Sequence, residues 1–232
     1  MSMTAENNSL TMRIFTFVNG SFIKNIFHGL FFRQPSVMKA LWGIKVPPLA
    51  RTLPFGTAYT DLTGFLLRGI LPGLVRSRDL GRVHEIGIGQ YGVMCVFMRK
   101  RFPLLSISGS SISPLEVENS SNAAKLNGFQ FPFYVSDVLA DFKGDPVELI
   151  WWNLPYYDPK ALDYLRRLFD QVRAKKALVD KGLLVVATNT VPLRAEPIVS
   201  LAENFAHLRV IEVKKYFWNP HAVLTMEYRE NR

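Results

Sequence analysis

The sequence predicts an α/β fold in which helices cover both faces of a doubly wound, mostly parallel β-sheet. From about residue 61 onward, short apolar runs alternate with segments of helical periodicity, which is the pattern that such a sheet produces. Seven strands are expected, and no helix separates the last two, so we expect an antiparallel hairpin at one edge. With 232 residues and 48% hydrophobic content, the chain can bury a large core.

The individual elements follow from apolar periodicity and from the turn residues between them. Strands are expected at residues 83–86, 104–108, 133–135, 149–152, 183–187, 210–214 and 222–228, and helices at residues 62–71, 91–100, 113–126, 160–176 and 196–206. We expect the first helix to end at Pro72-Gly73, because proline interrupts the hydrogen bonds of a helix. Trp151 and Trp152 are expected to pack in the core.

The first 55 residues form a basic, aromatic extension to a main domain of residues 56–232. Between residues 10 and 55 every charged side chain is Lys or Arg, and Phe and Trp side chains lie among them: the charged residues are Arg13, Lys24, Arg33, Lys39, Lys45 and Arg51. Apolar residues at helical spacing predict an amphipathic helix within residues 22–31, followed by breaks at Pro35 and at Pro47-Pro48. We favour packing of this helix against the main domain over two alternatives, a lid or substrate platform and a membrane-surface helix.

The net charge of +9 favours an anionic partner such as nucleic acid, an acidic protein or a membrane surface, although a basic protein without such a partner fits equally well. The single cysteine, Cys95, excludes an intramolecular disulfide and suits a reducing compartment, so we expect a cytoplasmic protein. No run of about 18 apolar residues occurs, and stable membrane insertion is not expected. The histidines are scattered without ligand spacing, so no metal site is expected.

A glycine-rich turn is the clearest motif of the chain. Residues 82–92 read Arg-Val-His-Glu-Ile-Gly-Ile-Gly-Gln-Tyr-Gly, which places Gly87, Gly89 and Gly92 directly after a strand and before a helix. Glycine permits a tight turn and the close approach of a ligand to the backbone, and the first amides of a helix attract negative charge. The segment from Glu85 to Gly92 therefore predicts the nucleotide-binding turn of a Rossmann-like domain.

Four motifs follow this turn in the order that successive βαβ units would give them. They are residues 106–116 (ending Ser-Ile-Ser-Pro-Leu-Glu), 122–128 (Asn-Ala-Ala-Lys-Leu-Asn-Gly), 135–138 (Val-Ser-Asp-Val) and 149–157 (Leu-Ile-Trp-Trp-Asn-Leu-Pro-Tyr-Tyr). With these motifs, the chain resembles the class I S-adenosylmethionine-dependent methyltransferases of small-domain type over about residues 60–228. That group carries an Asn-Pro-Pro-Tyr-like motif, written Asn-Leu-Pro-Tyr here, and includes glutamine and rRNA N-methyltransferases.

The resemblance implies S-adenosylmethionine as the cofactor and assigns it a set of residues. Glu85 and the glycine turn would hold the methionine part, and Asp137 with Val138 would hold the adenine. The family places an acidic residue at the end of the second strand, where it accepts the ribose hydroxyls, and this position corresponds to the neutral Ser111 (or Ser110). Serine accepts a weaker hydrogen bond than a carboxylate. Glu116, on the following helix, could in principle compensate for the missing acid, but we expect it to be a solvated helix residue.

The segment Asn153, Leu154, Pro155 and Tyr156 has a chemical rationale as a catalytic motif. The nitrogen of an amide or of a base amine is a poor nucleophile because its lone pair is delocalised. Asn153 Oδ1 and the Leu154 carbonyl would hold its N–H groups, while Tyr156 would stack on the planar substrate group and align it with the sulfonium methyl. No general base is required, since the nitrogen can lose its proton after attack. The alternative is a simple turn after a buried strand.

Together these inferences predict an S-adenosylmethionine-dependent N-methyltransferase that acts on a planar nitrogen. The acceptor would be a protein glutamine amide or a nucleic-acid base, and the basic extension favours nucleic acid or a ribosome-associated target. The alternative, from a different class, is a methyltransferase-like binding or scaffold protein with impaired catalysis, which the neutral Ser111 would be consistent with. Whether the protein binds S-adenosylmethionine and S-adenosylhomocysteine separates the two.

Overall fold

The computed structural model describes residues 34–47, 59–155, 158–190, 193–216 and 219–230. The strands are β1 (Arg82–Ile86), β2 (Ser106–Ser111), β3 (Phe133–Val135), β4 (Val147–Asn153), β5 (Leu178–Asn189), β6 (Leu208–Tyr216) and β7 (Asn219–Tyr228). The helices are α3 (Pro35–Val37), the π-helical η1 (Met38–Trp42), α4 (Leu62–Arg78), α5 (Val93–Arg101), α6 (Pro114–Leu126), α7 (Ala161–Ala174) and α8 (Ala195–Glu203). Within these ranges, no helix has both the length and the apolar character of a membrane span.

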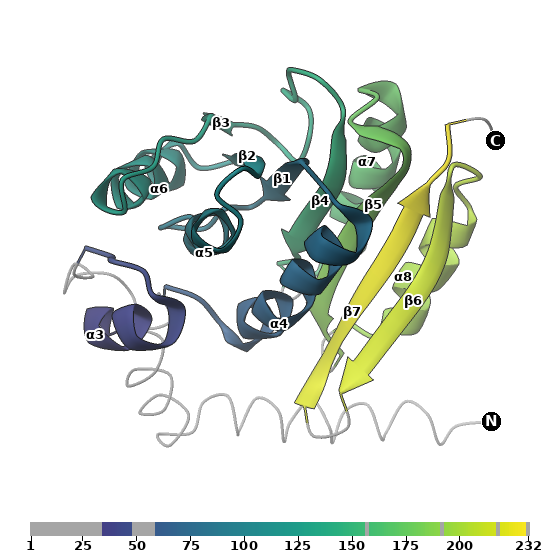
Figure 1. Ribbon diagram of the computed structural model, residues 1–232. Helices are drawn as coiled ribbons and strands as arrows, with labels where there is room; N and C mark the ends of the chain where they lie inside the picture. Colours follow the sequence, from purple (N-terminus) through teal and green to yellow (C-terminus); the bar gives the residue numbers. More distant parts are fainter. Residues whose placement is uncertain (1–33, 48–58, 156–157, 191–192, 217–218, 231–232) are drawn as a thin grey trace.

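The strands form one sheet of seven strands in the order β3-β2-β1-β4-β5-β7-β6 (Figure 1). From β3 to β5, all neighbouring strands pair in parallel. β7 is antiparallel both to β5 and to β6. The predicted Rossmann-like sheet with an antiparallel edge hairpin is therefore confirmed, and β7 inserts between β5 and the edge strand β6.

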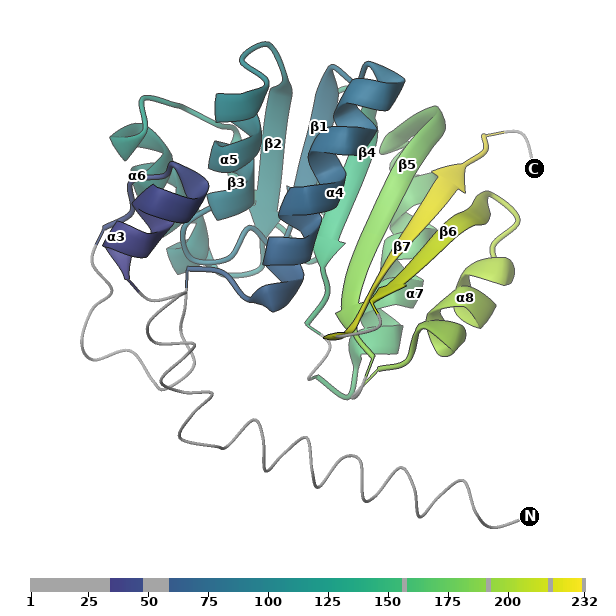
Figure 2. The same ribbon diagram turned by 60° about the horizontal axis from the view of Figure 1, so that its bottom comes forward.

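The strands alternate their side chains between two apolar cores, one on each face of the sheet. Along β4, Leu149 and Trp151 belong to the core shared with α4 and α5, whereas Ile150 and Trp152 belong to the core shared with α7 and α8. Both tryptophans are buried, as predicted. Figure 2 shows α4 and α5 in front of the sheet and α7 and α8 behind it. Because helices cover both faces, the central strands are apolar on both sides.

α4 continues past Pro72 to Arg78, so the predicted end of this helix is wrong. A proline inside a helix costs about 3 kcal/mol, because it removes one hydrogen bond and its ring meets the preceding turn. However, Leu67, Leu71 and Val75 form a stripe at four-residue spacing that is buried in the core. Burial of each such side chain contributes about 1.5–3 kcal/mol, so packing outweighs the cost of the proline.

Residues 34–47 pack into the same core as α4 and α5. Pro35 begins α3, because proline is tolerated in the first turn of a helix. Met38 and Trp42 are buried in this core, and the Trp42 ring lies 5.5 Å from that of Phe97 on α5, measured between centroids. The helix predicted within residues 22–31 lies outside the described residues.

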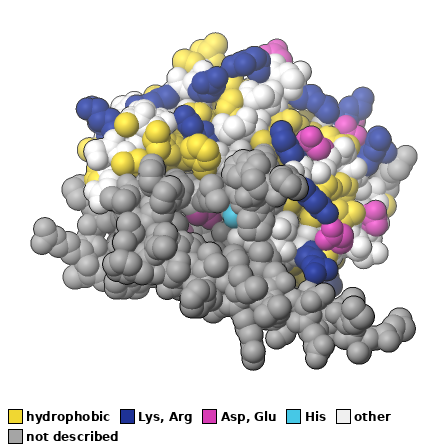
Figure 3. Space-filling model, turned by 90° about the horizontal axis from the view of Figure 1, so that it is seen from below, with side chains coloured by type: hydrophobic (Ala, Val, Ile, Leu, Met, Phe, Trp, Pro, Cys, Tyr) yellow, Lys and Arg dark blue, Asp and Glu magenta, His cyan; other side chains and the backbone are white. Residues whose placement is uncertain are grey.

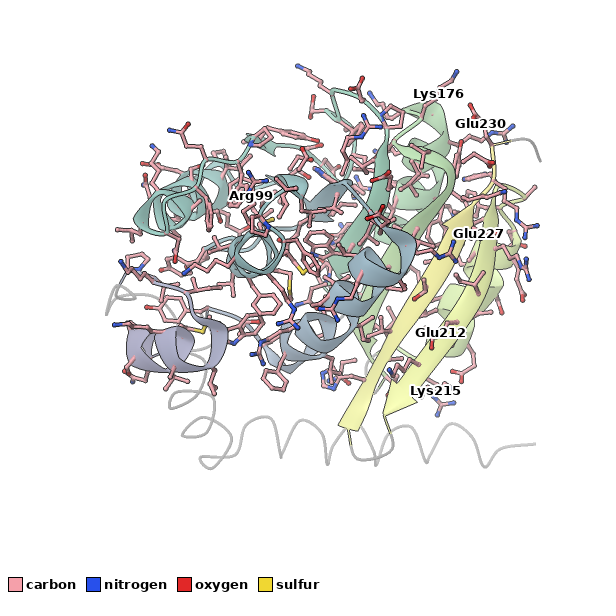
Figure 4. The ribbon with its side chains drawn as sticks, viewed as in Figure 1. Arg99, Lys176, Glu212, Lys215, Glu227 and Glu230 are labelled. Carbon is pink, nitrogen blue, oxygen red and sulfur yellow. The ribbon has the colours of Figure 1, made fainter. Side chains whose placement is uncertain are left out.

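The β6 edge of the sheet carries charged side chains. Glu212 and Lys215 on β6 and Glu227 on β7 lie on the side of the molecule away from Arg99 of α5 (Figure 4). Lys215 Nζ forms an ion pair with Glu196 Oε1 of α8 at 2.5 Å. β3, the opposite edge strand, has three residues. Charged or very short edge strands discourage pairing with another chain.

Candidate active site

The carboxyl ends of the parallel strands β1 to β4 lie along one edge of the sheet, at the bottom of Figure 2. In open α/β sheets, ligands bind just outside this edge. Figure 3 views the molecule from this end and shows Lys and Arg side chains around the described surface. Each predicted site residue that the structure describes lies near the end of one of these strands or directly after it: Glu85, Gly87, Gly89, Gly92, Ser111, Asp137, Val138, Asn153, Leu154 and Pro155. Tyr156 lies outside the described residues.

The glycine turn after β1 has the backbone conformation that its sequence requires. Gly87, Gly89 and Gly92 have φ values of +66°, +62° and +53°, in the left-handed region that favours glycine. A Cβ on Gly92 would also lie 3.2 Å from the Phe133 ring. The amide of Gly87 donates to the Ser110 carbonyl at 2.8 Å, which ties the turn to the end of β2. α5 begins at Val93, two residues later than predicted, because the turn occupies the residues before it.

Glu85 lies buried beneath this turn, with 7% of its surface exposed. The Cys95 thiol of α5 donates to Glu85 Oε2 at 2.9 Å. Burial raises the pKa of Glu85 to about 7, although the hydrogen bond from Cys95 acts in the opposite direction. Cys95 is itself buried, and burial together with Glu85 raises the pKa of its thiol well above the usual value. The pair therefore places a protonatable carboxyl group under the turn.

A buried polar cluster around His84 links the strands whose carboxyl ends carry the candidate site. The sequence analysis did not identify this cluster. His84 Nδ1 lies 2.8 Å from Ser108 Oγ, and His84 Nε2 lies 3.2 Å from Ser110 Oγ. Ser110 Oγ donates to the Val138 carbonyl at 3.3 Å. Burial lowers the pKa of His84 to about 3, so the ring is uncharged at neutral pH. The cluster joins β1, β2 and the segment after β3. The available signal was the alternate spacing of Ser108 and Ser110 on β2, which places two hydroxyls on the same face of the sheet.

The end of β2 carries a carboxylate after all, and the expectation that Glu116 is a solvated residue is wrong. Ser111 is 4% exposed and donates from Oγ to Glu116 Oε2 at 2.5 Å. Ser111 Oγ also accepts from the Ser113 amide at 3.2 Å. Glu116 is held near the strand end because α6 begins at Pro114, with the Ser113 hydroxyl accepting from the Glu116 amide at 3.3 Å. The side chain is half-buried rather than free in solvent.

Two exposed apolar residues neighbour Ser111, one in the chain and one across the sheet, and were not singled out from the sequence. Ile112, directly after β2, is 70% exposed, and Val135, the last residue of β3, is 45% exposed. Val135 is the register partner of Ser111, so the two positions are neighbours across the sheet edge. Both side chains are therefore accessible to a ligand at the carboxyl ends of β2 and β3.

Asp137 and Val138 follow β3 in a constrained segment. The Asp137 carboxylate forms an ion pair with the Arg167 guanidinium of α7. Val138 has φ of +58°, which a β-branched residue seldom adopts, and its side chain is buried. The next amide, that of Leu139, donates to Gln171 Oε1 at 2.7 Å. Strained backbone of this kind gathers at functional sites, where the surrounding contacts hold it.

Asn153 ends β4 and is oriented by a residue that the sequence did not indicate. Its Nδ2 donates to Asp61 Oδ1, at the start of α4, at 3.0 Å. Its Oδ1 is buried and has no hydrogen-bond partner within the described part of the chain. The Leu154 amide donates to the Ala187 carbonyl of β5 at 3.0 Å, which fixes the direction in which the chain leaves β4. The next residue, Pro155, is exposed.

Comparison with known proteins relates this chain to a protein family. The family model of the methyltransferase small domain matches residues 60–218. An uncharacterized protein of Mycoplasma pneumoniae is 28% identical over 92 residues, which cover 39% of this chain and 20% of that protein. Ribosomal RNA small subunit methyltransferase C of Vibrio vulnificus is 28% identical over 142 residues, which cover 61% of this chain and 39% of that protein. The chain therefore spans two fifths or less of the length of these two relatives.

Solved structures share the fold. A methyltransferase from Pyrococcus furiosus superposes with a TM-score of 0.66 at 14% identity, covering 90% of this chain and 99% of that one. A ribosomal protein L11 methylase from Lactobacillus delbrueckii subsp. bulgaricus superposes with a TM-score of 0.59 at 16% identity, covering 79% and 90%. Identities this low show the fold alone. The family match, however, spans well over half of the chain, so the chain belongs to the methyltransferase small domain family of class I methyltransferases, whose cofactor is S-adenosylmethionine.

Proposed function

We propose that this protein transfers a methyl group from S-adenosylmethionine to a planar nitrogen, and that the acceptor is a base in RNA. One observation carries the proposal: Asn153 Oδ1, at the carboxyl end of β4, is buried without a hydrogen-bond partner among the described residues. A buried acceptor without a partner costs about 1–3 kcal/mol, so an N–H group of the substrate would be stabilised there. The next residues, Leu154 and Pro155, continue the motif.

The residues at the sheet edge fit the cofactor. The bare backbone of Gly87, Gly89 and Gly92 allows close approach, and the buried carboxyl of Glu85 suits a cationic methionine part. The exposed Ile112 and Val135 would offer an apolar face to the adenine. Asp137 and Val138, which follow Val135 closely in the chain, would also contact the adenine. Ser111 with Glu116 supplies hydroxyl and carboxylate for the ribose hydroxyls. When bound, the cofactor supplies an electrophilic methyl group on a sulfonium centre.

The protein's part in the reaction is to position the nitrogen. Asn153 Oδ1 and the Leu154 carbonyl would accept its N–H groups and favour a localised lone pair directed at the methyl group that the cofactor would supply. After the transfer, the nitrogen would lose its proton to solvent. Tyr156 is predicted to stack on the acceptor ring. Positioning of this kind supplies much of the rate without a general base.

The choice of RNA as acceptor draws on charge and on the relatives. The net charge of +9 favours a polyanion, because phosphate contacts by Lys and Arg dominate affinity for nucleic acid. Relatives such as the Vibrio vulnificus protein are named as ribosomal RNA methyltransferases. We propose that the basic extension of residues 1–55 serves as a substrate platform in a cytoplasmic, ribosome-associated enzyme. A protein glutamine amide is the competing acceptor.

Transfer of labelled methyl groups tests the proposal. The substrates are small-subunit ribosomal RNA transcribed in vitro, the same RNA assembled into subunits, and a glutamine-containing peptide. We expect label in RNA; label only in the peptide would identify the glutamine amide instead. Asn153→Ala should abolish transfer and leave the calorimetric affinity for S-adenosylmethionine unchanged, whereas Asn204→Ala, at the end of α8, serves as the matched control.

The same calorimetry separates the enzyme from a scaffold protein. If neither S-adenosylmethionine nor S-adenosylhomocysteine binds at millimolar concentration, the fold has lost its cofactor and the protein acts by binding alone. Near-normal transfer by Asn153→Ala, in contrast, would leave the methyltransferase intact and remove the proposed mechanism.

A further inference from the structure

We infer that Asp61 is a positioning residue that fixes the orientation of the Asn153 amide, so that Oδ1 rather than Nδ2 faces the methyl acceptor. This inference rests on the proposed function, which assigns Asn153 to the acceptor nitrogen. Asp61 lies 92 residues before Asn153 in the sequence, outside every motif of the glycine turn and of the Asn-Leu-Pro-Tyr segment. The fold brings the two together where the start of α4 meets the end of β4.

Asp61 Oδ1 accepts two hydrogen bonds. The Gly64 amide donates at 2.7 Å, which caps the first turn of α4, and Asn153 Nδ2 donates at 3.0 Å. Glycine at position 64 keeps this turn free of a clash with the residue before the cap, because a Cβ there would lie 2.4 Å from Thr60 Oγ1. The cap therefore fixes the carboxylate, and the carboxylate reaches the strand end from a fixed position.

The chemistry of the two side chains makes the contact directional. The two ends of an asparagine amide have nearly the same size, but one accepts and the other donates. A carboxylate accepts only, so Asn153 turns Nδ2 toward Asp61 and Oδ1 away from it. Oδ1, which faces away from Asp61, is the buried atom that has no hydrogen-bond partner among the described residues. A rotated amide would set its oxygen against the carboxylate, where the two acceptors repel each other.

Loss of Asp61 would therefore affect the acceptor and not the cofactor. With no acceptor at position 61, the Asn153 amide can rotate and present Nδ2 to the substrate N–H, so that two donors face each other. The nitrogen then loses the contact that localises its lone pair and aligns it. The contacts of Glu85, the glycine turn and Glu116 remain unchanged, since none of them involves Asp61 in the described structure.

Three substitutions separate capping from orientation. Asp61→Ser keeps the cap, because Ser matches Asp at this position, but its shorter side chain does not reach Asn153. Asp61→Asn keeps both contacts through its own Oδ1. Asp61→Ala loses both. For each variant we would measure kcat and KM for transcribed ribosomal RNA, calorimetric affinity for S-adenosylmethionine, and the midpoint of thermal unfolding.

We expect Asp61→Ser to lower kcat about ten- to hundredfold, the effect of a small misplacement of a reacting group, while cofactor affinity and unfolding midpoint stay at wild-type values. Asp61→Asn should recover most of this loss. Asp61→Ala should lose as much kcat as the serine variant and should also unfold at lower temperature. A serine variant that loses stability or cofactor affinity together with kcat would overturn the inference, since the role of Asp61 would then be structural.

A second measurement reports the contact without any substrate. The side-chain amide signals of Asn153 in a ¹⁵N–¹H NMR spectrum are assigned by their absence from Asn153→Ala. They should shift in Asp61→Ser and stay near their wild-type positions in Asp61→Asn. Unshifted signals in the serine variant, or wild-type kcat in that variant when Asn153→Ala is inactive, would overturn the role of Asp61 alone. Near-normal transfer by Asn153→Ala would instead remove the proposed function of Asn153.

Discussion

Ser111 Oγ lies 2.5 Å from Glu116 Oε2, so the first turn of α6 returns a carboxylate to the end of β2. The family places an acid on the strand itself. Here the strand ends in a hydroxyl, and the acid reaches the same edge from five residues further along the chain. We therefore expect the pair to act as one hydrogen-bonding unit toward the ribose.

Glu116→Gln should weaken the affinity for S-adenosylhomocysteine by about tenfold or more, because a hydrogen bond to a charged group is worth roughly 1.5–3 kcal/mol. Titration calorimetry measures the change. Glu118→Gln is the matched control, since Glu118 is an exposed residue on the same helix. Equal affinities for the two variants would show that Glu116 has no part in binding.

The effect of placing an acid at position 111, on the strand itself, should depend on whether Glu116 is present. Ser111→Asp alone places a second carboxylate against Glu116, and the repulsion between like charges should weaken cofactor binding and lower stability. The double variant Ser111→Asp, Glu116→Ser exchanges the two groups and should bind S-adenosylhomocysteine better than either single variant. Additive effects of the two substitutions in calorimetry would argue against direct coupling.

Glu85 should make the stability of the protein depend on pH. Burial raises its pKa from 4.5 to about 7, so its contribution to stability is complete below about pH 4.5 and is lost as the pH rises through 7. Glu85→Gln stays neutral and should lack this loss. The free energy of unfolding of the wild type, relative to that of the variant, should therefore fall by a few kcal/mol between pH 4.5 and 8 in urea titrations.

The comparison with Glu85→Gln also removes the opposing effect of His84. Burial lowers the pKa of His84 to about 3, so its contribution is present above about pH 6.5 and is lost as the pH falls toward 3. Both proteins contain His84, and its effect cancels in the difference. A constant difference between the two proteins across this range would contradict the assignment to Glu85.

Two glycines of the turn should differ in their tolerance of alanine. Gly89→Ala meets no atom within 4 Å and has only the strain of its positive φ, about 1–2 kcal/mol. Gly92→Ala has the same kind of strain and also places its Cβ 3.2 Å from the Phe133 ring and 3.3 Å from Ser120 Cβ. Gly92→Ala should therefore unfold at a lower urea concentration. Equal midpoints would mean that the Phe133 ring moves aside without cost.

Local patterns were sufficient to predict most of the sheet. β3 has the predicted bounds, since a short apolar run between turn residues admits little else. The end of α4 was mispredicted because the proline rule is local, whereas the stripe of Leu67, Leu71 and Val75 gains its stabilisation from the sheet. Tertiary packing also explains why β5 starts at Leu178, where an irregular pairing with Val147 and Leu149 extends the strand.

The residues of the candidate site also differ in whether local sequence or tertiary packing determines their role. The glycine turn and Asn153 follow directly from the chain, because their chemistry depends on neighbouring residues. Asp61 could not be predicted, since nothing in the sequence relates residue 61 to residue 153. Glu116 was misjudged because helical periodicity alone does not show that the first turn of α6 returns toward β2. Contacts between distant segments depend on the topology and not on the motifs.

The position of β7 between β5 and β6 has a consequence for synthesis of the protein. β5 carries Val185, Val186 and Ala187, which are buried, yet its second neighbour is residues 219–228. While the ribosome adds the intervening residues, the main-chain groups along that side of β5 have no strand to pair with. Nascent chains that stall before β7 would therefore expose β5 as an apolar, unpaired edge strand, and they would be the species that chaperones retain.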